Sequence, residues 1–338
     1  MKPNFRNDYS EIMHPRILAR LAEQNLTKRA GYGTDEVCAS AAAKLRLKLT
    51  RDDADVHFLV GGTSANLIAL SAFLRPHEAV ICAATAHINV HETGSIEAAG
   101  HKLINIETRD GKLTPSLIEQ NFARYTDEHM VKPKLVFIAN ATELGTHYAL
   151  AELRALRAVC DRLGLLLYMD GARIGSAMAA SEVGFADLCC VCDAFYIGGT
   201  KNGAPVGEAM VIVNPKLKHD FRYIEKQRGG MLAKGFILGH IFDVLFDCNL
   251  YLELAGHANK CADKLRSVLA ANGVPLAYET ATNQVFAIVP NGKLGRWTDG
   301  VICEINERRA DETVLRFVTS WATSEEDLRA FEDAVAGI

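Results

Sequence analysis

The stretch Cys192-Asp193-Ala194-Phe195-Tyr196-Ile197-Gly198-Gly199-Thr200-Lys201-Asn202-Gly203 decides the fold. Its apolar residues predict a buried strand that ends at the two glycines, with Lys201 at the mouth of the strand. Desolvation lowers the pKa of a lysine in such a place, and a neutral amine can form a Schiff base. A solvated loop lysine is the plain alternative, because perturbed lysines are the exception. The rest of the chain has to decide between the two.

A second apolar run, residues 165–169, ends in Asp170 and is followed by Gly171, Ala172 and Arg173. Two adjacent strands that end in an acid and a lysine put both groups at one carboxyl edge of a sheet, where α/β folds bind cofactors. Pyridoxal phosphate (PLP) needs a lysine for its aldehyde and an acid for its pyridinium nitrogen. Asp170 could instead cap a turn, and Arg173 could be a surface ion-pair partner. Together with Lys201, the two residues favour a PLP site.

A glycine-rich turn supplies a candidate phosphate site. Residues 56–60 predict a strand, Gly61, Gly62 and Thr63 follow it, and residues 67–74 predict a helix. Backbone N–H groups at the start of that helix, its dipole and the Thr63 hydroxyl suit a phosphate. A plain helix cap is the alternative. The turn is neither a Walker loop nor a complete dinucleotide fingerprint, so ATP and NAD are poorly supported.

The combination of Asp170-Gly-Ala-Arg173 with Gly-Gly-Thr-Lys201-Asn-Gly resembles the threonine aldolases and related β-eliminating lyases. These are PLP enzymes of the aminotransferase-like fold, fold type I, and the resemblance covers nearly the whole chain. It implies an α/β fold: an N-terminal arm and a large domain with a mixed, mostly parallel sheet flanked by helices in residues 1–241. A small α+β domain in residues 242–338 is expected to follow.

The resemblance also implies roles for individual residues. In the family, a histidine matching His87 stacks on the cofactor ring, and a histidine matching His129 approaches the substrate β-hydroxyl. With Lys201 and Asp170 these are the expected catalytic residues. The expected cofactor-binding residues are Gly61, Gly62, Thr63, His87, Thr142, Glu143, Asp170, Arg173, Thr200, Lys201, Arg228 and Lys234. Arg228 and Lys234 would complete the phosphate site of a neighbouring subunit, with a solvated basic loop as the alternative.

The expected substrate-binding residues are Arg6, Asn7, Asp8, Tyr32, Arg173 and Arg316. Arg316 lies in the middle of an apolar, strand-like run, and such strands seldom bury an unpaired guanidinium. A role in binding the substrate carboxylate would explain it. Asn7 replaces the serine that is usual in the family. Tyr32 belongs to a Gly-Tyr-Gly loop that the family places near the active site of a dimer, although packing on its own subunit would fit equally.

The composition limits the class of protein. The chain has 338 residues, 49% of them apolar and 23% charged, which is ordinary for a soluble globular protein. A net charge of −4 favours neither nucleic acid nor a membrane surface. The start of the chain is polar, so no signal peptide is expected, and nine scattered cysteines fit reduced thiols in the cytoplasm. No metal is expected, because the cysteines at 189, 190 and 192 lack zinc-knuckle spacing.

The small domain has a weaker pattern. Residues 275–280, 284–289 and 314–321 predict strands, residues 235–250 and 254–271 predict helices, and a capped helix is expected from Ser324. A further helix is expected to begin at Thr85 in the large domain.

The resemblance implies PLP-dependent retro-aldol cleavage of a β-hydroxy-α-amino acid, such as L-threonine or L-allo-threonine, to glycine and an aldehyde. A PLP-dependent β-eliminating lyase, which releases pyruvate and ammonia, is the nearest alternative. A non-catalytic PLP-binding protein is a remote one. Apart from its small-molecule substrate, the expected partner is a second copy of the chain, in a homodimer or homotetramer with active sites shared between subunits.

Overall fold

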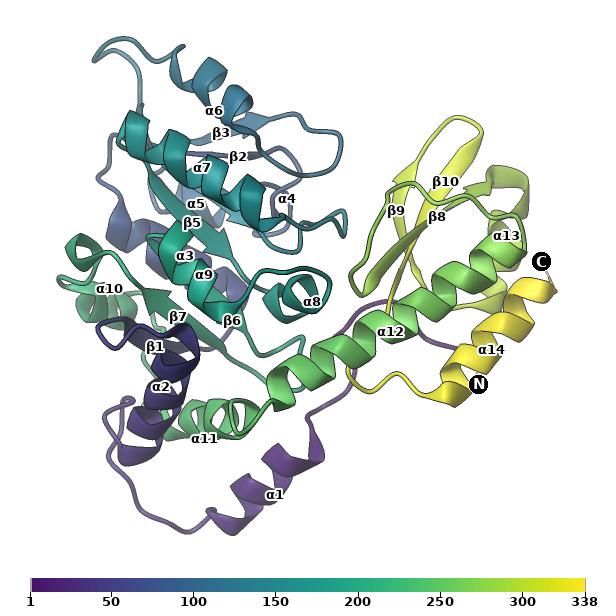
Figure 1. Ribbon diagram of the computed structural model, residues 1–338, viewed down its shortest axis with the longest axis horizontal. Coiled ribbons are helices and arrows are strands. Elements are labelled where there is room, and N and C mark those ends of the chain that lie inside the picture. The colour runs from purple at the N-terminus through teal and green to yellow at the C-terminus, as the bar shows by residue number, and fades with distance from the viewer. Residues whose placement is uncertain (1, 338) are drawn as a thin grey trace.

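The computed structural model describes residues 2–337, and its largest element is a seven-stranded sheet with the order β1-β7-β6-β5-β4-β2-β3 (Figure 1). Its strands are β1 (Asp55–Leu59), β2 (Glu78–Ala83), β3 (Leu103–Ile106), β4 (Lys132–Ala139), β5 (Leu166–Asp170), β6 (Ala194–Gly198) and β7 (Glu208–Ile212). Strands β2 to β6 run parallel, whereas β7 pairs antiparallel with both β6 and β1. The prediction of a mixed, mostly parallel sheet is confirmed.

Helices cover both faces of this sheet, because successive side chains of a strand point to opposite faces. In β6, Phe195 and Ile197 enter the core on one face, and Ala194 and Tyr196 enter the core on the other. The first face is covered by α2 (Glu36–Leu49), α6 (Pro115–Phe122), α7 (Leu150–Leu163), α8 (Ile174–Ala179), α9 (Phe185–Val191) and α11 (Phe236–Leu245). The second face is covered by α3 (Gly62–Phe73), α4 (His87–Val90), α5 (Ser95–Ala98) and α10 (Phe221–Gln227).

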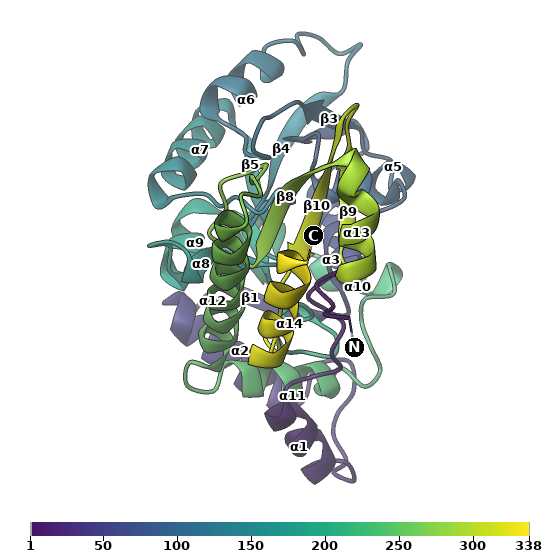
Figure 2. The same cartoon turned by 90° about the vertical axis from the view of Figure 1, so that its right-hand side faces the viewer.

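A smaller lobe follows in the chain and has a sheet of its own. Strands β8 (Gln284–Pro290), β10 (Glu312–Val318) and β9 (Glu304–Arg308) pair antiparallel in that order. Three helices pack beside them: α12 (Leu250–Ala271), α13 (Leu294–Gly300) and α14 (Glu325–Ala336) (Figure 2). The remaining elements are α1 (Pro15–Glu23) and two short 3₁₀ turns, Pro215–Leu217 and Asn291–Lys293. Ser324 caps α14 in a capping box, as expected.

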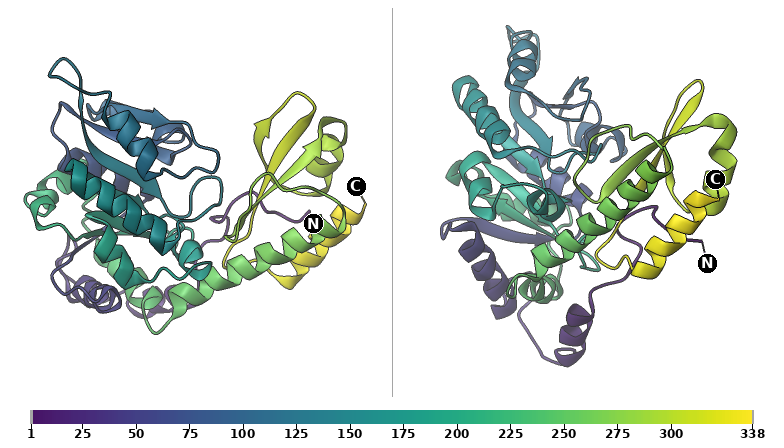
Figure 3. Two further views of the ribbon diagram at one scale, coloured as in Figure 1. Left: turned by 45° about the horizontal axis from the view of Figure 1, so that its top comes forward. Right: turned by 45° about the vertical axis from the view of Figure 1, so that its right-hand side comes forward.

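Two segments tie the lobes together. The N-terminal arm crosses to the smaller lobe, where Phe5 is buried against Phe331 at 5.4 Å between ring centroids. Helix α12 runs from one lobe to the other (Figure 3), and its start packs in the core of the larger lobe through Leu250 and Leu254. From Cys261 onward it packs in the core of the smaller lobe. We propose that the boundary between the two domains lies within α12. It is thus C-terminal to the boundary between residues 241 and 242 that the sequence predicted.

Two predicted elements of the sequence analysis are wrong. Residues 275–280 form no strand, and only an isolated bridge joins Leu276 to Ala287. Pro275 has no N–H to donate to a ladder, which explains the failure. The helix expected from Thr85 is the four-residue α4, because Thr93 and Gly94 adopt positive φ angles shortly afterwards.

Strand β9 was missed, and its sequence explains why. All five of its residues are exposed, so Glu304 to Arg308 show no apolar alternation that could mark a strand.

The cysteines at 189 and 190 lie in α9 and not at the start of a strand. Among residues 2–337, no helix combines the length and the apolar character that crossing a bilayer requires.

The close approach of β5 and β6 sets the geometry of their shared edge. A Cβ atom on Gly171 would lie 1.8 Å from the carbonyl oxygen of Tyr196, so only glycine fits after Asp170. The Gly198 N–H also donates to the Gly171 carbonyl at 3.0 Å. These contacts bring the residues that follow the two strands side by side.

We expect Gly171→Ala to destabilise the protein by about 3 kcal/mol or more, because backbone would have to move. Gly256→Ala is the matched control: Gly256 lies inside α12 with open space around its Cα, so alanine should stabilise by about 0.5–1 kcal/mol. Urea unfolding followed by circular dichroism measures both. Equal stability of the two variants would contradict the proposed close fit.

Candidate active site

A cavity of about 550 Å³ lies at the carboxyl edge of the large sheet, where the smaller lobe faces it. The ends of β5 and β6 and the start of α3 form one side, and β9 and β10 form the other. We call this cavity the edge pocket. Its lining residues are Tyr9, Gly62, Thr63, His87, His91, Glu143, Asp170, Ala172, Arg173, Tyr196, Thr200, Lys201, Glu304, Ile305, Asn306 and Arg316. Nine of the residues predicted for the site are therefore brought together.

Lys201 follows β6 in a tight turn and lines the pocket. Burial, and then the positive charge of Arg173, lower the pKa of its amine, although Asp8, Glu143 and Asp170 oppose that shift. A larger share of the amine is therefore neutral than for a solvated lysine. This is the state in which a lysine acts as a nucleophile.

Asp170 ends β5 and is fixed by three donors. Its Oδ1 accepts from the Tyr196 hydroxyl at 2.5 Å and from the Ala172 N–H at 3.0 Å. Its Oδ2 accepts from the Asn66 side chain at 3.0 Å. The carboxylate is 4% exposed, so these bonds hold it in one orientation toward the pocket.

A hydrogen-bond network that no sequence pattern predicted lies behind Asp170. Asn66 in α3 donates to both Asp170 and the buried carboxylate of Glu92, and its oxygen accepts from Tyr168. Glu92 in turn contacts the His87 Nδ1 at 2.9 Å. The network thus joins the acid of β5 to the histidine of α4. The only signal in the sequence was polar residues in apolar surroundings, which could not identify the partners.

The glycine turn before α3 fits a phosphate. Gly62 and Thr63 line the pocket, and no side chain caps the start of α3. A Cβ on Gly62 would lie 2.9 Å from the Tyr196 hydroxyl, so the glycine is needed for close packing. The helix therefore points its uncapped N-terminus into the cavity, as an anion site requires. Gly61 precedes the helix and lies outside the lining.

Arg173 is held by the N-terminal arm. Its Nε and Nη2 donate to the Asp8 carboxylate at 2.7 and 3.1 Å, and Asn283 from the smaller lobe donates to the same carboxylate at 2.9 Å. Burial raises the pKa of Asp8, but Arg173 and Lys201 outweigh it and bring that pKa below its usual value. Asp8 thus does not line the edge pocket itself; it orients the Arg173 side chain, which does.

Arg316 projects from β10 into the pocket. One Nη atom pairs with Glu304 of β9, while its Nε is buried and has no hydrogen-bond partner in the described structure. A buried donor without an acceptor is costly, so this arginine is suited to an anionic ligand.

Glu143 and Thr142 follow β4, and only Glu143 lines the pocket. Burial raises the pKa of Glu143, but the charges of Arg173, Lys201 and His87 lower it overall. Thr142 is buried instead, where its hydroxyl contacts that of Thr146 at 2.7 Å. Thr142 therefore shapes the loop, and Glu143 supplies a carboxylate to the pocket.

Several predicted residues lie elsewhere in this chain. His129 is exposed in the loop that enters β4, at the opposite edge of the sheet. Arg228 and Lys234 are exposed after α10, and Arg6 is exposed in the arm. The Asn7 side chain accepts from Tyr9 and Ser10 within its own turn. A role for His129, Arg228 or Lys234 in an edge pocket would need a second subunit.

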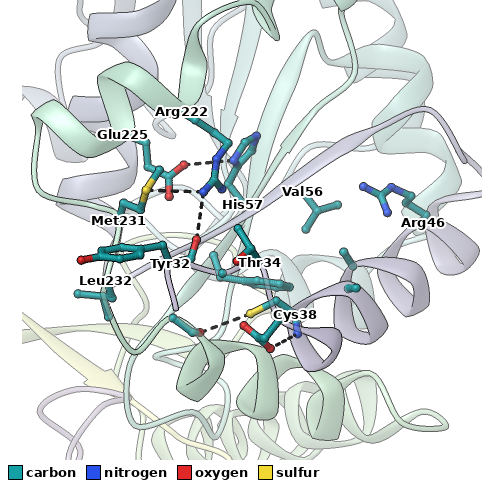
Figure 4. Close-up of a pocket in the computed structure, with 16 residues that line it drawn as sticks. Tyr32, Thr34, Cys38, Arg46, Val56, His57, Arg222, Glu225, Met231 and Leu232 are labelled. Carbon is teal, nitrogen blue, oxygen red and sulfur yellow. Dashed lines mark hydrogen bonds and ion pairs between the residues drawn. The ribbon is translucent and has the colours of Figure 1, made fainter. Parts of the chain in front are cut away.

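Tyr32 also lies outside the edge pocket. It lines a separate cavity of about 270 Å³ between α2, β1 and α10, which also contains the buried pair of His57 and Glu225 (Figure 4). The Lys226 amine lies 4.4 Å from the centroid of the Tyr32 ring, and Arg222 donates to the Tyr32 carbonyl. The ring is 47% exposed, so it is available to another subunit.

Among residues 2–337, no group of three or more histidine, cysteine, aspartate or glutamate side chains could hold a metal ion. The edge pocket contains an amine, two guanidinium groups, carboxylates and a helix N-terminus. Such a set matches a phosphorylated aldehyde cofactor and a substrate with a carboxylate.

The network predicts a pH effect on stability. Burial alone would lower the pKa of His87, but the hydrogen bond to Glu92 and the charges of Glu143 and Asp170 raise it above 6.5. A raised pKa means that the charged pair stabilises the fold fully below about pH 6.5 and stops doing so as the pH rises through the folded value. We expect Glu92→Gln to lower the melting temperature more at about pH 6 than at about pH 9.

Thermal unfolding at the two pH values measures this effect, and Glu107→Gln, at an exposed glutamate, is the control. Equal losses for Glu92→Gln at both values would show that His87 carries no charge in the pair.

A sequence profile of the β-eliminating lyase family matches residues 13–291. The low-specificity L-threonine aldolase of Pseudomonas sp. (strain NCIMB 10558) is 39% identical over 285 residues, with 83% of this chain and 82% of the relative covered. The enzyme of the same name from Pseudomonas aeruginosa is 38% identical over 285 residues, which again cover 83% of this chain and 82% of the relative.

Among solved structures, that of Leishmania major threonine aldolase is 44% identical and superposes with a TM-score of 0.97, covering 99% of this chain and 98% of that one. A Thermus thermophilus aspartate aminotransferase, at 16% identity and a TM-score of 0.74, shares the fold, that of the fold type I enzymes. The chain therefore belongs to the β-eliminating lyase family and is a relative of the threonine aldolases.

Proposed function

We propose that this chain is a PLP-dependent carbon–carbon lyase that cleaves a β-hydroxy-α-amino acid of the threonine class to glycine and an aldehyde. One observation carries the proposal: buried Lys201 shares the edge pocket with Asp170, His87, Arg173 and Arg316. The relatives named as threonine aldolases support it, because the similarity spans more than four fifths of this chain.

The residues of the pocket fit PLP. Lys201 would hold its aldehyde carbon, Asp170 would pair with its ring nitrogen, and the uncapped start of α3 would bind its phosphate. His87 also lines the pocket and supplies a flat ring that would stack on the cofactor. When bound, PLP supplies a conjugated ring that accepts the electron pair released as the Cα–Cβ bond breaks.

The two arginines bind and orient the substrate. The guanidinium of Arg316, which lines the pocket, would pair with the α-carboxylate, and Arg173, fixed by Asp8, offers a second positive charge. Holding the carboxylate at one end fixes the direction of the Cα–Cβ bond in the pocket. Such positioning contributes to the rate because only an aligned bond breaks readily.

The β-hydroxyl proton must leave as the bond breaks, so the pocket needs a base. His87, His91 and Glu143 line it. The lowered pKa of Glu143 keeps that carboxylate ionised, so it can accept a proton directly or through a water, although it is a weaker base than a solvated glutamate. Among groups of the same chain, we assign the role to this cluster, while His129 would take it only from a neighbouring subunit.

We expect Lys201→Ala to abolish glycine release, because among residues 2–337 no other lysine lines the pocket. Lys102→Ala, at an exposed lysine just before β3 and away from the pocket, should behave as wild type. The measurements are the visible absorption of the PLP-loaded protein and the release of glycine from L-threonine and L-allo-threonine. Full glycine release by Lys201→Ala would sink the assignment.

The product distinguishes the two lyase reactions. Cleavage at the Cα–Cβ bond yields glycine, whereas elimination of a β-substituent yields pyruvate and ammonia. Pyruvate as the main product, from a substrate with a β-leaving group, would favour β-elimination over the aldolase.

We expect Arg316→Lys to raise the KM for the amino acid by about tenfold or more, because a lysine cannot offer the second donor of the guanidinium fork. Arg309→Lys is the control, since Arg309 pairs with Glu307 and Glu312 on the exposed side of the same small sheet. Steady-state kinetics measures both. An unchanged KM for Arg316→Lys would remove the arginine from the carboxylate site.

We further propose a homodimer or homotetramer. Exposed large apolar side chains among residues 12–32 support it, namely Ile12, Leu18, Leu26 and Tyr32. Analytical ultracentrifugation tests the assembly. We also propose the cytoplasm as its location, supported by nine cysteines that are all free and lie within the described residues.

A further inference from the structure

Glu208 is a buried carboxyl without an assigned task. It is the first residue of β7, paired across the sheet with Gly198 of β6 and Leu59 of β1, and it is 4% exposed. It does not line the edge pocket, so it touches neither substrate nor cofactor there. Burying a carboxyl group is unfavourable unless hydrogen bonds compensate for the lost contact with water.

Its two oxygens are bound to the two residues that precede Lys201. Oε2 accepts from the Gly199 N–H at 3.0 Å, and Oε1 accepts from the Thr200 hydroxyl at 2.8 Å. The neighbouring Gly207 carbonyl accepts from the N–H groups of the same two residues at 3.0 and 3.2 Å. The start of β7 thus holds the turn that carries Lys201 by side chain and backbone together.

We propose that Glu208 is a positioning residue for Lys201, which fixes the Gly199–Thr200 turn through two hydrogen bonds and keeps a titratable carboxyl beside the lysine. The inference rests on the proposed function, in which Lys201 holds the cofactor.

The carboxyl group of Glu208 changes its charge not far from neutral pH. Burial raises its pKa to about 8, while the Thr200 hydroxyl, Lys201 and the Gly199 N–H oppose the shift. The other groups that feel its charge are Asp170 and Tyr168 of β5, Tyr196 of β6 and Tyr251 of α12. The tyrosines stay neutral because burial raises their pKa values. An ionised Glu208 therefore stabilises the ammonium form of Lys201.

The test is the pH dependence of Lys201 labelling by an amine-reactive ester in the full-length protein without PLP, mapped by mass spectrometry. Glu208→Gln keeps the shape and removes the charge, so the ammonium form of Lys201 loses support. We expect its labelling midpoint to fall by about half a pH unit or more. Glu78→Gln is the matched control, because Glu78 is a buried glutamate that begins β2 at the opposite edge of the same sheet.

Kinetics of the PLP-loaded protein gives the second readout. Glu208→Asp keeps the charge but is one methylene too short to reach both donors, so its labelling midpoint should stay at the wild-type value. Its kcat should fall by about tenfold with KM unchanged, since the lysine is aimed less well. If Glu208 had only a structural role, Glu208→Asp would lower the melting temperature but would not lower kcat at an unchanged KM.

The outcomes separate the two proposals. An unshifted labelling midpoint in Glu208→Gln, an equal shift in Glu78→Gln, or a wild-type kcat in Glu208→Asp overturns the role of Glu208. If Glu208→Gln does not fold, Glu208→Asp decides by its kinetics. A wild-type protein that neither binds PLP nor releases glycine refutes the proposed function, and the labelling midpoint then still decides the role of Glu208.

Discussion

The structure depends on one constraint: charged groups gather at a single buried edge of a sheet, and each needs a counterpart there. Lys201 and Arg173 bring positive charge, whereas Asp8, Glu143 and Asp170 bring negative charge. In a medium of low polarity a lone charge would be expelled or neutralised. Because carboxylates lie near both cations, the amine can be desolvated enough to react and still remain in a stable fold.

This balance requires segments that lie far apart in the sequence. Asp8 of the arm meets Arg173 after β5, and Asn283 from the start of β8 donates to the same carboxylate. The arm, the large sheet and the smaller lobe therefore share one hydrogen-bonded cluster. The position of the smaller lobe and the orientation of Arg173 are therefore linked, because both Asn283 and Arg173 donate to the Asp8 carboxylate.

Local chemistry made part of the site predictable from the sequence. An apolar run that stops at Gly-Gly-Thr-Lys, and another that stops at Asp-Gly-Ala-Arg, identify a sheet edge with a lysine and an acid, because strands end where their apolar runs end. The resemblance to a family then named residues such as His87 and Arg316. Strand β9 was not predictable, since a short, fully exposed strand depends on pairing with β10 and not on its own pattern.

The missed residues share a physical reason. Asn66 lies within the apolar helix α3, and Glu208 begins an otherwise apolar strand, so neither stands out in the sequence from an ordinary polar residue. Their importance comes from partners: Asn66 meets Asp170 across 104 positions of the chain, and Glu208 meets the turn before Lys201. A sequence identifies the groups that do chemistry by their type. The groups that hold them in place are identified by distance, which only the folded chain supplies.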